Sequence, residues 1–255
     1  MLNIVTRLIS ALILASIALA ALFVGGFLFP TLCALAAGFM LWEVSSLSSP
    51  DISRRLAIGI GVVAALASFA ATALFPQTPV ADLHPIGIAL LAAFALDSGR
   101  IRFALTAAAI LQATHSLALL RLDAGISISL WLILTVVATD TGAYIAGKLL
   151  GGPKLLPKLS PNKTWSGAVG GLCAAVLVGF AFLTQFGMPV IVAAPLVSIC
   201  AQFGDLAESW LKRQAGAKDS SSLIPGHGGV CDRFDGMVGG CLGYWLLNLS
   251  GINPL

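Results

Sequence analysis

Apolar runs of about 20 residues recur along the whole chain, each bounded by charged residues, glycine or proline. A helix rises about 1.5 Å per residue, so such a run can cross a hydrocarbon core about 30 Å thick. The runs lack the period-two alternation of a transmembrane barrel strand, so helices are expected. The pattern predicts about nine transmembrane helices, at 4–24, 27–43, 56–75, 84–97, 102–121, 127–148, 165–186, 190–212 and 230–249.

Composition supports this interpretation. The chain has 255 residues, of which 58% are hydrophobic and 10% charged, far too little charge for the surface of a soluble domain of this length. The first run follows a single basic residue and could be mistaken for a signal peptide, but it is too long and further runs follow it. We therefore expect an all-α, polytopic helical bundle that forms one membrane-embedded domain over 1–255.

The basic residues predict the orientation of this bundle. Of 14 Lys and Arg residues, 13 fall at the N-terminus or near the loops after the second, fourth, sixth and eighth runs. Arg121 alone falls on the opposite side. Because basic residues concentrate on the cytoplasmic side of membrane proteins, the N-terminus is expected to be cytoplasmic. The loops 149–164 and 213–229 then face the cytoplasm as well.

Polar residues recur at helical spacing near the cytoplasmic ends of three predicted helices. Residues three, four, seven or eight positions apart lie on one helix face. An ionised group within a membrane span costs on the order of 2.5–3.5 kcal/mol at mid-depth, so this concentration indicates a functional site. The three sets are Asp140, Tyr144 and Lys148; Gln202, Asp205, Ser209 and Lys212, with Glu208 adjacent; and Asp232 with Asp235.

Two loops between these helices carry groups that suit phosphate. The loop 149–164 holds three lysines and several hydroxyl residues, and it ends where a predicted helix begins, a position that favours an anion. The loop 213–229 holds Lys218, Asp219 and a His-Gly-Gly sequence whose glycines let backbone approach a ligand closely. Carboxylates together with Lys and Arg suit a polyphosphate held through a divalent metal, since Mg²⁺ prefers oxygen ligands.

The first half of the chain offers fewer candidates. Glu43 follows Trp42 at the end of the second predicted helix, and we expect an interfacial pair there rather than a site residue. The arginines after the second and fourth predicted helices are expected to anchor the topology, with anionic lipid headgroups as an alternative partner. They are Arg54, Arg55, Arg100 and Arg102.

Spaced residues between 209 and 235 resemble a known signature. They are Ser209-Trp-Leu-Lys212-Arg213, Lys218-Asp219, Ile224-Pro225, His227-Gly228-Gly229 and Asp232-Arg233-Phe-Asp235. This pattern is similar to that of the phosphatidate cytidylyltransferases, also called CDP-diglyceride synthases. Upstream, Asp140-Thr-Gly-Ala-Tyr144 and Ser160-Pro-Asn162-Lys163-Thr164-Trp165 resemble the same family, whereas Gly236 stands where many members have Ser.

The resemblance implies a reaction in which CTP and phosphatidate give CDP-diacylglycerol and diphosphate. It also implies a homodimer. The Ala-rich composition and compact form suggest the bacterial inner (plasma) membrane, the basic residues predict an active site facing the cytoplasm, and no nucleic-acid partner is expected. The resemblance also implies Mg²⁺ and a monovalent cation such as K⁺. Residues 1–126 would be N-terminal membrane helices, and 127–255 the catalytic core helices with their cytoplasmic loops.

The resemblance and the residue chemistry together suggest individual roles. The expected metal ligands are Asp219 and Asp232, followed by Asp235, Asp205 and Asp140. The residues expected to hold triphosphate or the phosphatidate headgroup are Lys212, Arg213, Lys218 and Arg233. His227 would contact phosphate or shape the turn. Further substrate contacts are expected from Ser160, Asn162, Lys163, Thr164, Ser209, Gly228 and Gly229.

Other functions remain open from the sequence. A CTP-dependent enzyme could act on another lipid acid, or on a polyprenol as a kinase. A transporter could use intramembrane carboxylates to relay ions, but its carboxylates should lie near the midplane rather than on one side. The CDP-alcohol phosphotransferases require an Asp-rich motif that this chain lacks.

Overall fold

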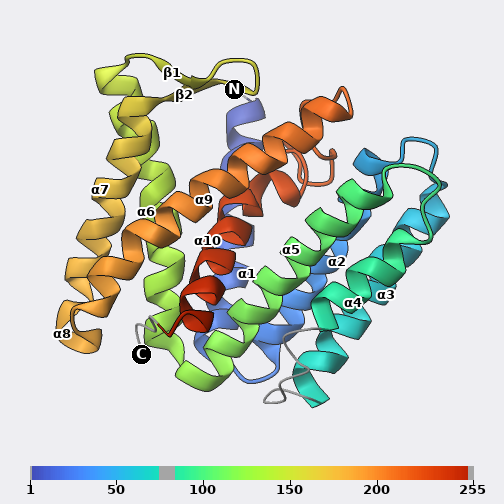
Figure 1. Cartoon of the computed structure of the whole chain (residues 1–255), viewed down its shortest axis with the longest axis horizontal. Helices are drawn as coiled ribbons and strands as arrows, with labels where there is room; N and C mark the ends of the chain where they lie inside the picture. Colours follow the sequence, from blue (N-terminus) through green and yellow to red (C-terminus); the bar gives the residue numbers. More distant parts are fainter. Residues whose placement is uncertain (1, 75–83, 252–255) are drawn as a thin grey trace. The chain divides into compact units, whose positions relative to one another are not determined.

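The apolar runs form helices in the structure, a computed structural model that describes residues 2–74 and 84–251 (Figure 1). In the first half the elements are α1 (Leu2–Val24), α2 (Leu28–Ser48), α3 (Arg54–Leu74), α4 (His84–Ala93), α5 (Arg100–Leu119) and a π-helical turn, η1 (Leu120–Ala124). In the second half they are α6 (Ile126–Leu150), β1 (Lys154–Leu156), β2 (Ser160–Thr164), α7 (Trp165–Ala181), α8 (Leu183–Phe186), α9 (Pro189–Gln214) and α10 (Cys231–Leu249).

The predicted all-α membrane bundle is confirmed. Within the described residues, six helices are long and apolar enough to span a membrane: α1, α2, α3, α5 continued by η1, α6 and α9. The apolar helices α4 and α7 are shorter, and α10 carries three charged residues near its start. The count of nine spans and the cytoplasmic N-terminus therefore stay predictions.

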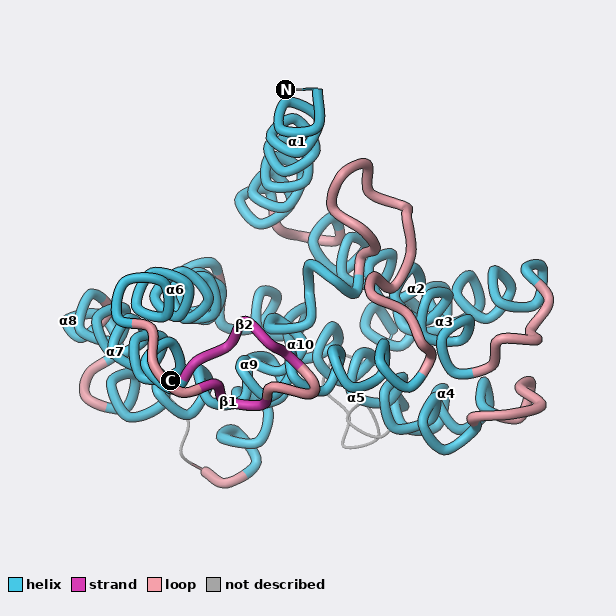
Figure 2. Tube along the Cα trace, turned by 90° about the horizontal axis from the view of Figure 1, so that it is seen from above, coloured by secondary structure: helices cyan, strands magenta, loops and turns pink. Residues whose placement is uncertain are grey.

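The structure differs from the sequence prediction in several places. The helix expected at 84–97 ends at Ala93. The helix expected at 27–43 continues to Ser48, so Glu43 lies inside α2 rather than at its end. The helix expected at 165–186 breaks after Ala181 into α7 and the short α8. The loop 149–164 contains an antiparallel hairpin, β1 with β2, in which Lys154 pairs with Thr164 (Figure 2). The hairpin is too short to show a periodic pattern in the sequence.

The chain divides into two compact units. The first comprises 1–126 and 211–234, and the second comprises 127–210 and 235–255. The end of α9 and the start of α10 therefore belong to the first unit, together with the loop between them.

In the first unit, α2 packs against α3 and α5, and α4 packs against α5 (Figure 2). The backbones of α2 and α3 nearly touch at Gly38 and Gly61, where a Cβ on Gly38 would lie 2.7 Å from the Gly61 carbonyl oxygen. Such close approach between helices depends on residues without a side chain. α1 contributes few buried residues, and its exposed leucines and isoleucines present an apolar surface suited to lipid.

In the second unit, glycines again set the helix packing. A Cβ on Gly142 of α6 would lie 2.8 Å from the carbonyl oxygen of Gly170 on α7. A Cβ on Gly204 of α9 would lie 2.5 Å from the carbonyl oxygen of Asp235, and Gly243 of α10 packs against Cys200. The glycines of α10 thus let this helix pack closely against α9 within the chain.

The contact between α2 and α3 generates a stability prediction. Gly61→Ala should lower the free energy of unfolding by about 1–3 kcal/mol, because the new Cβ would lie 2.5 Å from the Gly38 carbonyl oxygen. The matched control is Gly59→Ala on the same helix, where nothing lies within 4 Å of the new Cβ. Removing a helical glycine there should leave stability unchanged or raise it by up to about 1 kcal/mol. Unfolding midpoints in detergent check both, and shifts of the same sign would contradict the packing account.

Candidate active site

The segment between α9 and α10 forms a loop, residues 215–230, which we call the signature loop. It leaves α9 through a helix-ending motif in which Ala217 N–H donates to the Lys212 carbonyl at 2.9 Å and Gly216 N–H to the Arg213 carbonyl at 3.1 Å. Gly216 has φ of +66°, the left-handed conformation that this motif requires and that glycine adopts without strain. The loop thus leaves the helix in a fixed direction.

Asp232, in the first turn of α10, ties the loop to both flanking helices. Its Oδ1 accepts a hydrogen bond from Lys212 Nζ at 2.6 Å. Its Oδ2 accepts from the Ser220 N–H at 2.8 Å, the Ser220 hydroxyl at 2.9 Å and the Gly229 N–H at 2.8 Å. Four donors around one carboxylate favour its ionised form, and both oxygens are occupied by the protein itself.

Glu43 of α2 holds the same parts of the loop from the other side of the sequence, near Ser220 and near Val230. Its side chain is 1% exposed. Oε1 accepts from the Val230 N–H at 2.8 Å and the Ser221 hydroxyl at 2.7 Å, and Oε2 from the Cys231 N–H at 2.8 Å and the Ser220 hydroxyl at 3.0 Å. The first N–H groups of a helix lack partners within it and favour a negative charge, so Glu43 caps α10.

The expectation of an interfacial Trp-Glu pair was therefore wrong. Glu43 lies inside α2, and its partners are 177 to 188 residues away in the sequence. One signal could have found it: a lone carboxylate within an apolar run needs a partner, and no basic residue stands within a helical turn on either side. The chain supplies that partner from the signature loop.

The glycines of the loop make room for these two carboxylates. A Cβ on Gly228, whose φ is +85°, would lie 2.6 Å from Asp232 Oδ2. A Cβ on Gly229 would overlap the Ser220 hydroxyl and the Glu43 carboxylate. The close backbone approach expected at this pair is present, and in the structure it serves protein carboxylates.

The remaining charged groups of the loop face outward. Arg213, Lys218, Asp219 and Arg233 are exposed, whereas Lys212 is held by Asp232. Arg233 Nε donates to the His227 carbonyl at 3.0 Å, which steadies its stem near the loop. Three exposed cations and one exposed carboxylate, on the signature loop and the helix ends beside it, form a surface suited to a phosphate ligand and its counterion.

α1 also touches the signature loop. The Ser10 hydroxyl donates to the Pro225 carbonyl at 3.1 Å. Gly226 lies against Arg7, and a Cβ there would come within 2.8 Å of the Arg7 side chain. Residues from both ends of the first unit's sequence thus position this loop.

The second unit gathers a separate polar group. Lys163 of β2 forms an ion pair with Asp205 of α9, and Asp140 of α6 is close enough to interact electrostatically with both. A Cβ on Gly236 would lie 3.4 Å from Asp140 Oδ2. A hydroxyl at that position would therefore face Asp140.

The other predicted residues of the second unit take different places. Thr164 caps α7, since its hydroxyl accepts from the Gly167 N–H at 3.1 Å. Ser160 and Ser209 are partly buried, and Asn162 is exposed on the hairpin. Asp235 Oδ1 accepts from the adjacent Gly236 N–H at 2.8 Å.

The predicted metal carboxylates fall into two sets. Asp219 and Asp232 belong to the first unit, and Asp140, Asp205 and Asp235 to the second. Among the described residues, no three His, Cys, Asp or Glu side chains are arranged to hold a metal ion by themselves. Mg²⁺ commonly uses only one or two carboxylates and completes its shell with waters and substrate phosphates, so the exposed Asp219 still fits such an ion.

Comparison with known proteins identifies the family of this chain. Residues 5–249 match the model of the cytidylyltransferase family, and the chain belongs to that family. It is 42% identical to the phosphatidate cytidylyltransferase of Brucella suis biovar 1 over 253 residues, covering 92% of this chain and 90% of the relative. It is 46% identical to that of Helicobacter pylori over 125 residues, covering 48% of this chain and 47% of the relative. The family resemblance carried by the signature residues is confirmed.

The buried carboxylate generates a prediction about the loop. In Glu43→Gln, the amide nitrogen cannot accept hydrogen bonds, so the N–H of Val230 or of Cys231 loses its acceptor, while the serine hydroxyl beside it can turn to accept from the amide. Each buried donor left unsatisfied costs about 1–3 kcal/mol. We expect faster proteolysis and hydrogen exchange over 215–230 and a large loss of activity.

Asp51→Asn is the control, because Asp51 is an exposed carboxylate of the same unit. Its exchange pattern should match the wild type. Protection of the signature loop that is the same in Glu43→Gln and the wild type would contradict the capping role of Glu43.

Proposed function

We propose that this chain transfers the cytidylyl group of CTP to phosphatidate, giving CDP-diacylglycerol and diphosphate. The observation that carries the proposal is the signature loop. Glu43 and Asp232 hold it at both ends, and it presents Arg213, Lys218 and Asp219 outward. It does so in a chain that matches the cytidylyltransferase family over 5–249.

The chemistry requires positioning more than a reactive side chain. A phosphate oxygen of phosphatidate forms a bond to the α-phosphorus of CTP, and the bond from that phosphorus to the bridging oxygen of the β-phosphate breaks. The attacking oxygen already carries negative charge near neutral pH, so neither a covalent nucleophile nor a strong base is needed. In-line alignment and neutralisation of charge supply most of the rate enhancement.

The exposed cations would perform that neutralisation. Arg213, Lys218 and Arg233 are exposed, and Arg offers paired N–H donors that match phosphate geometry. Arg213 donates to the Ala217 carbonyl at 3.3 Å and Arg233 to the His227 carbonyl at 3.0 Å, and each guanidinium keeps further N–H donors for phosphate. Lys212 acts differently, because its ion pair with Asp232 fixes the end of α9 relative to the loop. Lys212 and Asp232 therefore position the site rather than bind substrate directly.

Asp219 is the residue of this loop that would hold Mg²⁺. It is exposed, its carboxylate is the hard oxygen ligand that Mg²⁺ prefers, and the structure gives its side chain no hydrogen bond or ion pair within the described residues. A bound Mg²⁺ would neutralise phosphate charge and lower the barrier to displacement. A monovalent cation such as K⁺ is implied by the family resemblance alone.

The polar group of the second unit would supply further phosphate contacts. Lys163 is paired with Asp205, and Ser160 and Asn162 lie on the same hairpin. The protein is a multi-pass membrane protein, and the distribution of basic residues supports a cytoplasmic site. We place it in a bacterial inner membrane, since the relatives named above are bacterial, and as a homodimer from the resemblance.

Product analysis tests the reaction. Purified protein in detergent with labelled CTP, phosphatidate and Mg²⁺ should yield labelled CDP-diacylglycerol on thin-layer chromatography. Folded protein that forms no lipid-linked CMP under any metal would overturn the proposal and favour a transporter. CDP and a phosphorylated polyprenol would instead identify a kinase.

A substitution tests the metal ligand. Asp219→Asn should lower activity on the order of 10²-fold and shift the Mg²⁺ requirement upward, because a ligand charge is lost while the loop keeps its fold. Asp123→Asn is the control, an exposed carboxylate outside the loop. Wild-type turnover with unchanged Mg²⁺ dependence in Asp219→Asn would remove Asp219 from the metal site.

A further inference from the structure

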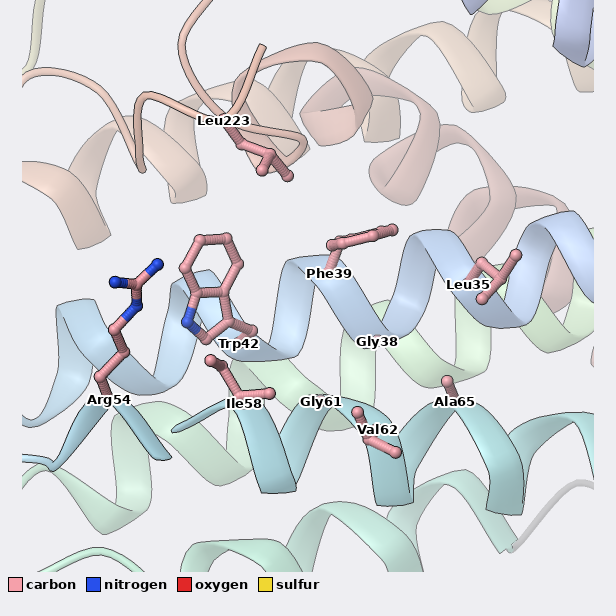
Figure 3. Close-up of a pocket in the computed structure, with 10 residues that line it drawn as sticks. All are labelled: Leu35, Gly38, Phe39, Trp42, Arg54, Ile58, Gly61, Val62, Ala65 and Leu223. Carbon is pink, nitrogen blue, oxygen red and sulfur yellow. The ribbon is translucent and has the colours of Figure 1, made fainter. Parts of the chain in front are cut away.

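An apolar groove of about 300 Å³ lies between α2 and α3 in the first unit (Figure 3). Small-molecule sites range from about 300 to 1,000 Å³, so the groove has room for part of a ligand, such as one chain of a lipid. Leu223 of the signature loop covers one side of it. The groove therefore adjoins the loop that carries the proposed site.

The two helices line the groove with matching stripes. On each helix the lining residues follow the spacing i, i+3, i+4 and i+7, which is one continuous face. The glycines bring the two backbones together at the floor, and larger side chains form the walls. The stripes are Leu35, Gly38, Phe39 and Trp42 on α2, and Ile58, Gly61, Val62 and Ala65 on α3.

The groove has one charged end. Arg54, one turn before Ile58, is the only ionisable residue that lines it within the described part of the chain. Figure 3 shows Arg54 beside Trp42 at one end of the groove, with Leu35 and Ala65 at the other. Trp next to Arg is typical of the membrane interface, where an apolar ring meets lipid headgroups.

The length of the groove fits one leaflet. From Arg54 to Ala65, α3 rises about 16 Å at 1.5 Å per residue. That is about half of a hydrocarbon core about 30 Å thick. An apolar groove of this length with a cation at its interfacial end complements an acyl chain joined to an anionic headgroup.

The wall of the groove formed by Leu223 is tied to α2 through hydrogen bonds of the signature loop. Leu223 N–H donates to the Ser221 hydroxyl at 3.1 Å, and that hydroxyl donates to Glu43 Oε1 at 2.7 Å. Glu43 directly follows Trp42 on α2. The contacts that fold the loop thus also fix the wall of the groove.

We propose that this groove binds an acyl chain of the phosphatidate substrate, with Arg54 against its phosphate. The inference rests on the proposed function for the identity of the lipid. A bound chain would hold the headgroup at the membrane surface beside the signature loop. Arg54, expected from the sequence to be a topological anchor, then also selects an anionic lipid.

Photolabelling tests occupancy without requiring turnover. Phosphatidate carrying a diazirine on one acyl chain is added to the protein in phosphatidylcholine nanodiscs, irradiated, and the labelled residues are located by mass spectrometry. We expect label on the segments 35–42 and 58–65, displaced by unlabelled phosphatidate but not by added phosphatidylcholine. Label elsewhere, or equal displacement by both lipids as for a boundary lipid, would overturn the proposal.

Kinetics test the function of the groove. Val62→Trp should raise KM for long-chain phosphatidate roughly tenfold, since excluding even two methylenes costs about that factor, and leave turnover of dihexanoyl phosphatidate unchanged. Val63→Trp is the matched control, an exposed neighbour that does not line the groove. Equal KM values in both variants, or a loss of short-chain turnover confined to Val62→Trp, would overturn the proposal.

Substitutions of two adjacent arginines test whether the charge at the end of the groove binds the lipid phosphate. Arg54→Gln should raise KM for phosphatidate several-fold, whereas Arg55→Gln, an adjacent exposed arginine outside the groove, should not. Equal effects would indicate general attraction to the anionic surface and contradict a role specific to Arg54. If the wild type makes no CDP-diacylglycerol, the proposed function fails, while the labelling pattern still decides whether an anionic lipid occupies the groove.

Discussion

The buried carboxylate of Glu43 is the interaction on which the signature loop depends. An ionised group in an apolar helix is costly unless donors surround it, and Glu43 receives four. Those donors come from a loop with no helix or sheet of its own apart from the single bridge between Ile224 and Gly228. Each side satisfies the other, because the loop neutralises the cost of the charge and the charge orders the loop.

The three acidic residues at the signature loop have two different roles. The carboxylate oxygens of Glu43 and Asp232 accept hydrogen bonds from protein donors and so define the shape of the loop. Asp219 lies on the same loop, exposed. A loop that binds polyphosphate must keep its conformation when the charged ligand binds. Carboxylates that accept several hydrogen bonds from the protein hold the loop in that conformation. Substituting Glu43 or Asp232 should therefore disturb the shape of the loop, whereas substituting Asp219 should leave that shape intact.

Sequence reasoning succeeded where the cause is local. Long apolar runs predict helices because each turn must satisfy its own backbone in lipid, and the spaced residues from Ser209 to Asp235 indicate the family. It failed where the partner is remote. Nothing near Glu43 in the sequence announces Ser220 or Val230, and helical spacing could not reveal that Asp232 turns toward Lys212 and the loop. The groove could not be predicted for the same reason, because its walls come from two helices and from Leu223, which is distant in the sequence.

The reaction joins a nucleotide from water to a lipid from the bilayer, so the protein must align two substrates that arrive from different phases. α2 is suited to this because two consecutive side chains point in different directions. Trp42 lines the apolar groove, and Glu43 holds the polar loop. One turn of helix fixes both directions, since successive side chains point about 100° apart. A lipid chain beside Trp42 would therefore have a fixed position relative to the signature loop, because Trp42 and Glu43 are neighbours on one helix. This removes part of the entropic cost of aligning the phosphate of phosphatidate with the α-phosphate of CTP.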